Sequence, residues 1–276
     1  MLLSSFTLES VLARIDLQDA GMTDYDLAED RALVASILLE EQLPDGSWSR
    51  SLLRTAESLL TLRVLLDGMR SSAVDRAIDW LHARAATSDT TPRLFFEAAP
   101  AFVDLSELRL ESGLLVGSDL DARVAAAALA CAALLEWNED SDTIRAQCAE
   151  LEVAAHAKSM EDMTLSATAL VCATRCLLAA ESTAHVDALE SIARSQRGDG
   201  SWRGVDLFVV LDVLALAVQR KRAPAIVMRA LVNAADLLGL MQQPDGRWGR
   251  DTSSWQMLAG WRALRCVTPL VAAPAE

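Results

Sequence analysis

Two carboxylates stand at the start of a long, Ala-rich apolar stretch near the middle of the chain. Asp119 and Asp121 are followed by Ala122 and Arg123, and the apolar run then continues to residue 135. A like charge nearby raises the pKa of a carboxyl group, whereas a cation or the N-terminus of a helix lowers it. Two interpretations follow: a proton donor beside a second carboxylate, or a helix cap followed by an ordinary first-turn carboxylate.

Other polar and aromatic residues interrupt apolar stretches with helical periodicity. Burying a charge is costly, so a charge in such a stretch is expected to face a polar or ligand-filled space. Glu57, Arg63, Arg175 and Asp212 are charges of this kind. Together with the aromatic residues and the cation beside the two carboxylates, they give the substrate-binding candidates: Arg123, Glu57, Arg175, Asp212, Phe95, Phe96, Trp255 and Trp261.

A repeated turn sets the positions of these residues. The pattern Gln-x-x-Asp-Gly-x-Trp occurs at residues 42–48, 196–202 and 242–248, each time between two helix-like stretches. The copies are 154 and 46 residues apart, and the longer gap holds three periods if two copies have been lost. A period of about 50 residues fits a pair of helices with two connections. The repeating unit is therefore predicted to be a helical hairpin.

Each residue of the turn has an expected role. Gly supplies backbone angles that a side chain disfavours, and Asp accepts hydrogen bonds from N–H groups of the turn or the next helix. We expect the Gln amide to bond the last carbonyls of the preceding helix and to pack on the Trp ring.

This turn resembles the QW motif of terpenoid cyclases related to the squalene-hopene cyclases, within the alpha/alpha toroids that include protein prenyltransferase beta subunits. The resemblance implies an all-α fold: a double ring of about five to six helical hairpins around a central cavity. Outer helices would lead into each turn, and inner helices would lead out of it. Residues 1–276 are expected to form one such domain, in single-barrel form.

Residues 119–122 resemble the D-x-D-D motif of class II terpene cyclases, which also opens an inner helix. The resemblance implies that Asp121 is the general acid and Asp119 its neighbour. The fourth position departs from the motif, because it holds Ala122 instead of Asp.

The predicted outer and inner helices alternate along the chain. The outer helices cover residues 27–41, 72–86 (capped by Ser72), 141–157, 183–196 and 224–242, and the inner helices cover 52–66, 118–136, 163–180, 205–219 and 252–267. An N-terminal helix is expected within residues 1–22, an insertion near the cavity mouth at 87–117, and a loose tail at 269–276. The lost turns fall within residues 87–117 and 158–162.

Composition excludes several classes of function. The net charge of −14 and the lack of an extended basic run argue against a nucleic-acid partner. The longest apolar run, residues 124–135, is too short for a membrane span, and the N-terminus lacks the features of a signal peptide. A cytoplasmic protein with a small hydrophobic substrate is expected. The oligomeric state stays open.

No cofactor or metal is expected from the sequence. The five cysteines are interpreted as buried apolar residues in a reducing compartment. Cys172 and Cys176, with His156 or His185, lack a standard metal-ligand spacing. Residues 139–142 and 161–162 are acidic loops that can hold magnesium only if the substrate carries a diphosphate.

Two functions are compatible with this sequence. The first is a class II-like, protonation-initiated terpenoid cyclase, an isomerase that acts on an isoprenoid or isoprenoid-bearing substrate. The second is a toroid without protonation chemistry, serving as a ligand-binding protein or as a cyclase of a non-terpenoid intermediate. Ala122 and an aromatic content of only 5% favour the second.

Overall fold

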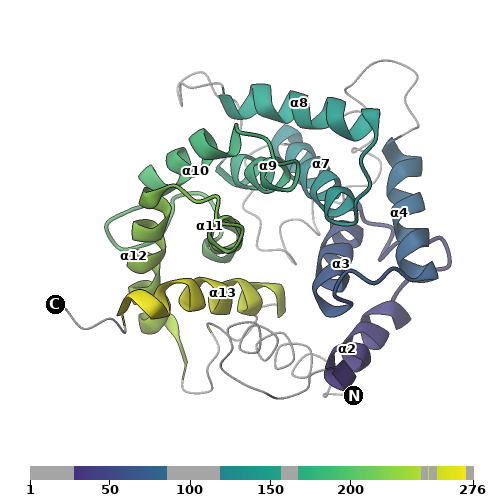
Figure 1. Ribbon diagram of the computed structural model, residues 1–276, viewed down its shortest axis with the longest axis horizontal. Coiled ribbons are helices and arrows are strands. Elements are labelled where there is room, and N and C mark those ends of the chain that lie inside the picture. The colour runs from purple at the N-terminus through teal and green to yellow at the C-terminus, as the bar shows by residue number, and fades with distance from the viewer. Residues whose placement is uncertain (1–27, 86–118, 157–166, 244–247, 249–253, 272–276) are drawn as a thin grey trace. The chain divides into compact units, whose positions relative to one another are not determined.

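The computed structural model describes residues 28–85, 119–156, 167–243, 248 and 254–271 (Figure 1). Apart from an isolated bridge between Gln196 and Trp202, these residues contain no β-structure. None of their helices has both the length and the apolar character needed to cross a membrane. The helices are α2 (Ala28–Glu40), α3 (Leu52–Leu65), α4 (Ser72–Ala85), α7 (Asp119–Glu136), α8 (Asp142–His156), α9 (Ala167–Ala179), α10 (His185–Arg194), α11 (Leu207–Gln219), α12 (Ala225–Met241) and α13 (Ser254–Val271).

The chain divides into two compact units, with residues 31–188 in one and residues from 189 onward in the other. In the first unit α7 packs between α3 and α9, while α4 packs on α3 and α8 packs on α7 and α9 (Figure 1). In the second unit α11, α12 and α13 pack against one another. The expectation of a single domain over the whole chain stays a prediction.

Burial separates the helices into the two predicted kinds. In α7 every described side chain from Val124 to Leu134 is buried, because the helix is apolar on all sides and has helices on several of them. In α4 the buried side chains, among them Val74, Ile78 and Leu81, form one stripe, and the opposite face is exposed. Inner helices are therefore core elements, and outer helices are amphipathic covers.

The predicted helix bounds agree with the structure to within a few residues for all five pairs. The largest differences are four residues: α9 begins at Ala167 instead of residue 163, and the last helix continues through Pro269 to Val271 instead of ending at residue 267. The N-terminal helix within residues 1–22, the insertion at 87–117 and the second lost turn at 158–162 lie outside the described residues.

The first two Gln-x-x-Asp-Gly-x-Trp turns have the same hydrogen bonds. Asp45 Oδ1 accepts from the amide and the hydroxyl of Ser47, and Asp199 Oδ1 accepts likewise from Ser201, which confirms the turn role of Asp. These hydrogen bonds hold the pKa of both Asp carboxyls below the ordinary value of 3.8. Each turn Gly has a positive φ, 94° in the first turn and 84° in the second.

The roles predicted for Gln and Trp were wrong in one respect. The Trp indole, not the Gln amide, donates to a carbonyl in the last turn of the preceding outer helix. Gln instead reaches forward: Gln42 Nε2 donates to Gly46 O and to Ala73 O of α4, and Gln196 Nε2 donates to Gly200 O and to Ala230 O of α12. The turn therefore joins one hairpin to the next outer helix. The indole bonds are Trp48 to Leu38 O, Trp202 to Ile192 O and Trp248 to Leu238 O, at 2.7 to 2.9 Å.

A second repeated turn closes the inner helices. Two residues after the end of α3, α7, α9 and α11, the backbone has a positive φ between 48° and 61°. The next residue then donates its N–H to the carbonyl five residues earlier, at 2.9 to 3.1 Å, as in a Schellman motif. The positive-φ residues are Asp67, Asn138, Glu181 and Lys221. They share no residue type, so this repeat has no motif in the sequence.

Candidate active site on the inner helices

The two carboxylates of the predicted acid site lie in the first turn of an inner helix. Helix α7 begins at Asp119, one residue after the predicted start, and Asp121 and Arg123 follow within the helix. The side chains of residues 119–123 lie outside the described ones. The next two residues, Val124 and Ala125, are buried, and the helix as a whole packs against α3 and α9. The first turn of α7 is thus an extension of a core helix.

Asp212 is the predicted site residue whose surroundings are best defined. It lies in the middle of α11 with 2% of its surface exposed, and Arg262 Nη1 of α13 donates to its Oδ1 at 3.2 Å. We had expected a charge in mid-helix to face the cavity. The structure provides another place for it, the contact between two neighbouring inner helices.

Arg262 was missed in the sequence. It interrupts a run of small and apolar residues, with Ala259, Gly260 and Ala263 around it, and it lies 50 residues after Asp212, which is about one repeat. An opposite charge at the same place in the next inner helix is the signal that could have found it. Because both partners are largely buried, removing either one should cost far more than a surface ion pair would.

Charges in the first unit occupy different environments. Arg175 is buried in α9, and Glu57 is half-buried in α3. Arg63, near the end of α3, donates from Nε to Glu136 O at 2.8 Å and lies over the ring of Trp137, 5.8 Å from its centroid. It therefore ties the end of one inner helix to the end of the next.

The aromatic candidates are only partly described. Trp261 is half-buried on α13, with its ring centroid 5.5 Å from that of Trp248 in an edge-on arrangement, and Phe208 of α11 lies 6.0 Å from Trp248 on another side. The ring of Trp248 lies so close to Gly260 that a Cβ there would meet it at 2.7 Å. Phe208 is a core residue at 6% exposure. Phe95, Phe96 and the side chain of Trp255 lie outside the described residues.

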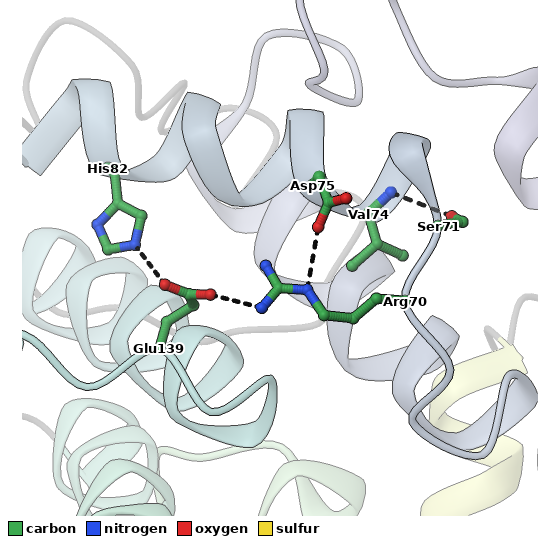
Figure 2. Close-up of polar contacts among 6 residues, drawn as sticks. All are labelled: Arg70, Ser71, Val74, Asp75, His82 and Glu139. Atoms are coloured by element: carbon green, nitrogen blue, oxygen red, sulfur yellow. Dashed lines mark hydrogen bonds and ion pairs between the residues drawn. The ribbon is translucent and has the colours of Figure 1, made fainter.

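The acidic loop at residues 139–142 is occupied by ion pairs. Glu139 binds Arg70 Nη1 at 2.7 Å and lies 3.4 Å from His82 Nε2 (Figure 2). The hydrogen bond with Glu139 raises the pKa of Arg70. Asp140 receives two hydrogen bonds from Arg145 at 2.8 Å. Glu139 therefore links the turn after α7 to Arg70 and to α4, whereas Asp140 pairs locally with α8. Residues 161–162 lie outside the described part.

Figure 2 also corrects the predicted cap of α4. The hydroxyl that accepts from the helix N-terminus belongs to Ser71, which bonds Val74 N at 3.3 Å, and Ser72 is already the first helical residue. Within the described ranges, no group of three His, Cys, Asp or Glu side chains is arranged to hold a metal ion.

Comparison with known proteins places the fold. No protein-family model and no curated protein sequence matches the chain. Among solved structures, it is similar to an aspartate-to-alanine variant of the type II terpene cyclase MstE from Scytonema in complex with its product merosterolic acid A. The TM-score is 0.57 and the identity 15%, over 95% of this chain and 87% of that chain. The chain shares its fold with a type II terpene cyclase.

Two further structures agree with this. An aspartate-to-asparagine variant of MstE with its substrate, geranylgeranyl dihydroxybenzoate, has a TM-score of 0.56 at 14% identity, over 95% of this chain and 88% of that chain. A protein from Actinoplanes has a TM-score of 0.57 at 16% identity, over 93% and 88%. The all-α fold of the alpha/alpha toroid class, predicted from the sequence, is confirmed.

Proposed function

We propose that this chain is a class II-like terpenoid cyclase, with Asp121 as the general acid and Asp119 as its neighbour. One observation carries the proposal. In a chain that shares its fold with type II terpene cyclases, the two carboxylates occupy the first turn of α7, a helix whose following residues are core. In the proposed reaction Asp121 protonates a double bond or epoxide of an isoprenoid, the carbocation closes one or more rings, and loss of a proton completes an isomerisation.

The physical requirement is an acid that stays protonated until the substrate arrives. In general, burial and a nearby carboxylate raise the pKa of a carboxyl group, while a helix N-terminus and a nearby cation lower it. An apolar substrate that expels water from the site strengthens the first pair of effects. The substrate-binding candidates of the sequence, with Trp261 and Arg175 among the described ones, remain part of this proposal. We propose that the reaction takes place in the cytoplasm and needs no cofactor.

The test measures whether a proton from the solvent is incorporated into the product. The full-length protein is incubated in deuterium oxide with linear prenyl alcohols, their diphosphates and a prenylated dihydroxybenzoate, and products are separated by liquid chromatography and mass spectrometry. A cyclic isomer that has gained one deuteron at carbon is expected. Parallel reactions of the diphosphate substrates with and without EDTA show whether magnesium takes part.

Two variants locate the acid. Asp121→Asn should abolish the cyclic product, because the amide cannot donate a proton of this acidity. Asp187→Asn is the matched control, since Asp187 lies in the first turn of the outer helix α10 and is exposed. If Asp121→Asn forms the labelled product as fast as the Asp187 variant, the assignment of the acid is wrong.

The second function keeps the fold without the acid chemistry. Ala122 at the fourth motif position favours it, because the motif loses one carboxylate. It predicts that prenyl ligands change the tryptophan fluorescence of the wild-type protein and of Asp121→Asn equally, with no labelled product from either.

A further inference from the structure

Three cysteines from three different helices meet in the core of the first unit. Cys148 of α8 lies with its Sγ 3.6 Å from Sγ of Cys176 in α9, and the two thiols form a hydrogen bond. Cys131 of α7 forms another side-chain hydrogen bond with Cys176. Cys131 and Cys176 are 0% exposed and Cys148 is 7% exposed, and all three are free thiols. From the sequence, these residues are interpreted as small apolar core residues. That interpretation explains why they are buried, but not why thiols from different helices lie next to one another.

We propose that Cys148 and Cys176 form a reversible disulfide when the protein meets a peroxide. The two sulfurs already face each other, and they must approach from 3.6 Å to the bond length of about 2.05 Å. Side-chain rotation supplies most of that movement when the helices themselves stay in place. The proposed bond links the outer helix α8 to the inner helix α9.

The chemistry balances with one peroxide for each disulfide. Cys148 reacts first, because it is the more exposed of the two residues. Its thiolate attacks a peroxide oxygen and the O–O bond breaks, which gives a sulfenic acid and hydroxide, and the hydroxide takes up the proton that the thiol had released to become water. The Cys176 sulfur then attacks the sulfenic sulfur, the S–O bond breaks, and a second water leaves with the thiol proton. Two thiols lose two electrons and two protons, and one peroxide is reduced to two waters.

The surroundings of the thiols set the conditions for this reaction. The hydrogen bond between the two thiols, followed by burial, raises the pKa of Cys148, and the pKa of Cys176 is raised too, first by its hydrogen bond with Cys131. Few thiolates are therefore present at neutral pH, and local opening of α8 has to admit the peroxide. The pair stays reduced under mild conditions and responds to sustained oxidation.

Formation of this disulfide would raise the thermal stability of the protein. The bond closes a loop over residues 148–176, which contains the whole connection from α8 to α9. Constraining a loop of roughly 30 residues in the unfolded chain should raise the Tm by about 5 °C for a chain of this size. The oxidised protein would join α8 and α9 by a covalent bond that the reduced one lacks.

The experiment maps the bond directly. The native full-length protein is treated with hydrogen peroxide, the remaining thiols are alkylated in denaturant, and a non-reducing digest is analysed by mass spectrometry. We expect one peptide pair joined through Cys148 and Cys176, lost on reduction, together with the higher Tm. Cys148→Ser should remove both effects. Cys266→Ser is the matched control, since Cys266 lies on α13 and its Sγ contacts Ala215 O.

Several results would overturn the proposal. Alkylation of both Cys148 and Cys176 after peroxide treatment would show that they do not react, and a sulfinic acid at Cys148 would show that Cys176 does not reach it. An equal yield of the same crosslink from the denatured chain would show that the fold does not place the two thiols. If Cys148→Ser does not fold, the wild-type map and Cys266→Ser still decide the question.

Discussion

Gly200 offers the sharpest test of the repeated turn. Its φ is +84°, and a Cβ there would lie 2.5 Å from the carbonyl oxygen of Asn233, a backbone atom of α12. The left-handed backbone costs an L residue about 1–2 kcal/mol. The clash can be relieved only by moving α12, which stretches the 2.8 Å hydrogen bond from Gln196 to Ala230 O, worth about 1 kcal/mol. Gly200→Ala should therefore lower the free energy of unfolding by about 2–3 kcal/mol.

Substitutions at two neighbouring glycines separate the cost of the left-handed backbone from the cost of the clash with α12. Gly198 has no positive φ of this kind and no atom near a built Cβ, whereas Gly204 has a φ of +73° and equally open surroundings. Gly198→Ala should be neutral or stabilise by up to about 1 kcal/mol, and Gly204→Ala should destabilise by about 1 kcal/mol. Urea unfolding followed by tryptophan fluorescence measures all three. If Gly200→Ala costs no more than Gly204→Ala, the close approach of the turn to α12 contributes nothing, and the reasoning is refuted.

Further predictions concern charge and backbone. Because the folded pKa of Asp45 and Asp199 is lowered, the unfolded chain takes up protons first as the pH falls, so their contribution to stability is present above pH 3.8 and is lost below it. Changing both to Asn should flatten the acid side of a plot of Tm against pH, and an unchanged slope would contradict this. Arg262→Ala should lower the free energy of unfolding, measured in urea, by about 3–5 kcal/mol, because Asp212 stays buried without this guanidinium. The double variant Asp212→Leu with Arg262→Met should recover most of the lost stability. Lys221→Gly should raise the free energy of unfolding by about 0.5–1 kcal/mol, since φ is 56° there, and a lower Tm would show that the Lys side chain stabilises the turn.

Local sequence signals were sufficient for the helices. The Asp-Gly turns marked the starts of α3, α11 and α13, and apolar periodicity marked the rest, so ten helices were placed with small errors at their ends. The error at Pro269 has a local reason. The sequence predicts a loose tail from residue 269, because proline lacks an N–H donor and disfavours a helix interior, whereas α13 continues through Pro269 for two more residues.

Partners far apart in the sequence were not predictable in the same way. In the first two turns, Gln finds an acceptor more than 30 residues later, in the next outer helix. Trp takes the helix end that the sequence predicts for Gln. Both side chains can donate a hydrogen bond to a carbonyl, so only the packing of neighbouring hairpins decides between them. The ion pair of Asp212 with Arg262 was hidden for the same reason, because it forms between two helices.

The second repeated turn changes how the lost copies of the first are understood. Helices α7 and α9 follow the two places where the Gln-x-x-Asp-Gly-x-Trp pattern is missing, yet both end in the same backbone turn as α3 and α11, at Asn138 and Glu181. Their hairpins therefore keep the repeat geometry at one end without its sequence motif at the other. Loss of the motif is thus no sign that the fold has decayed around α7. The start of α7 therefore lacks the turn sequence that precedes α3, α11 and α13, and Asp119 and Asp121 stand at that start.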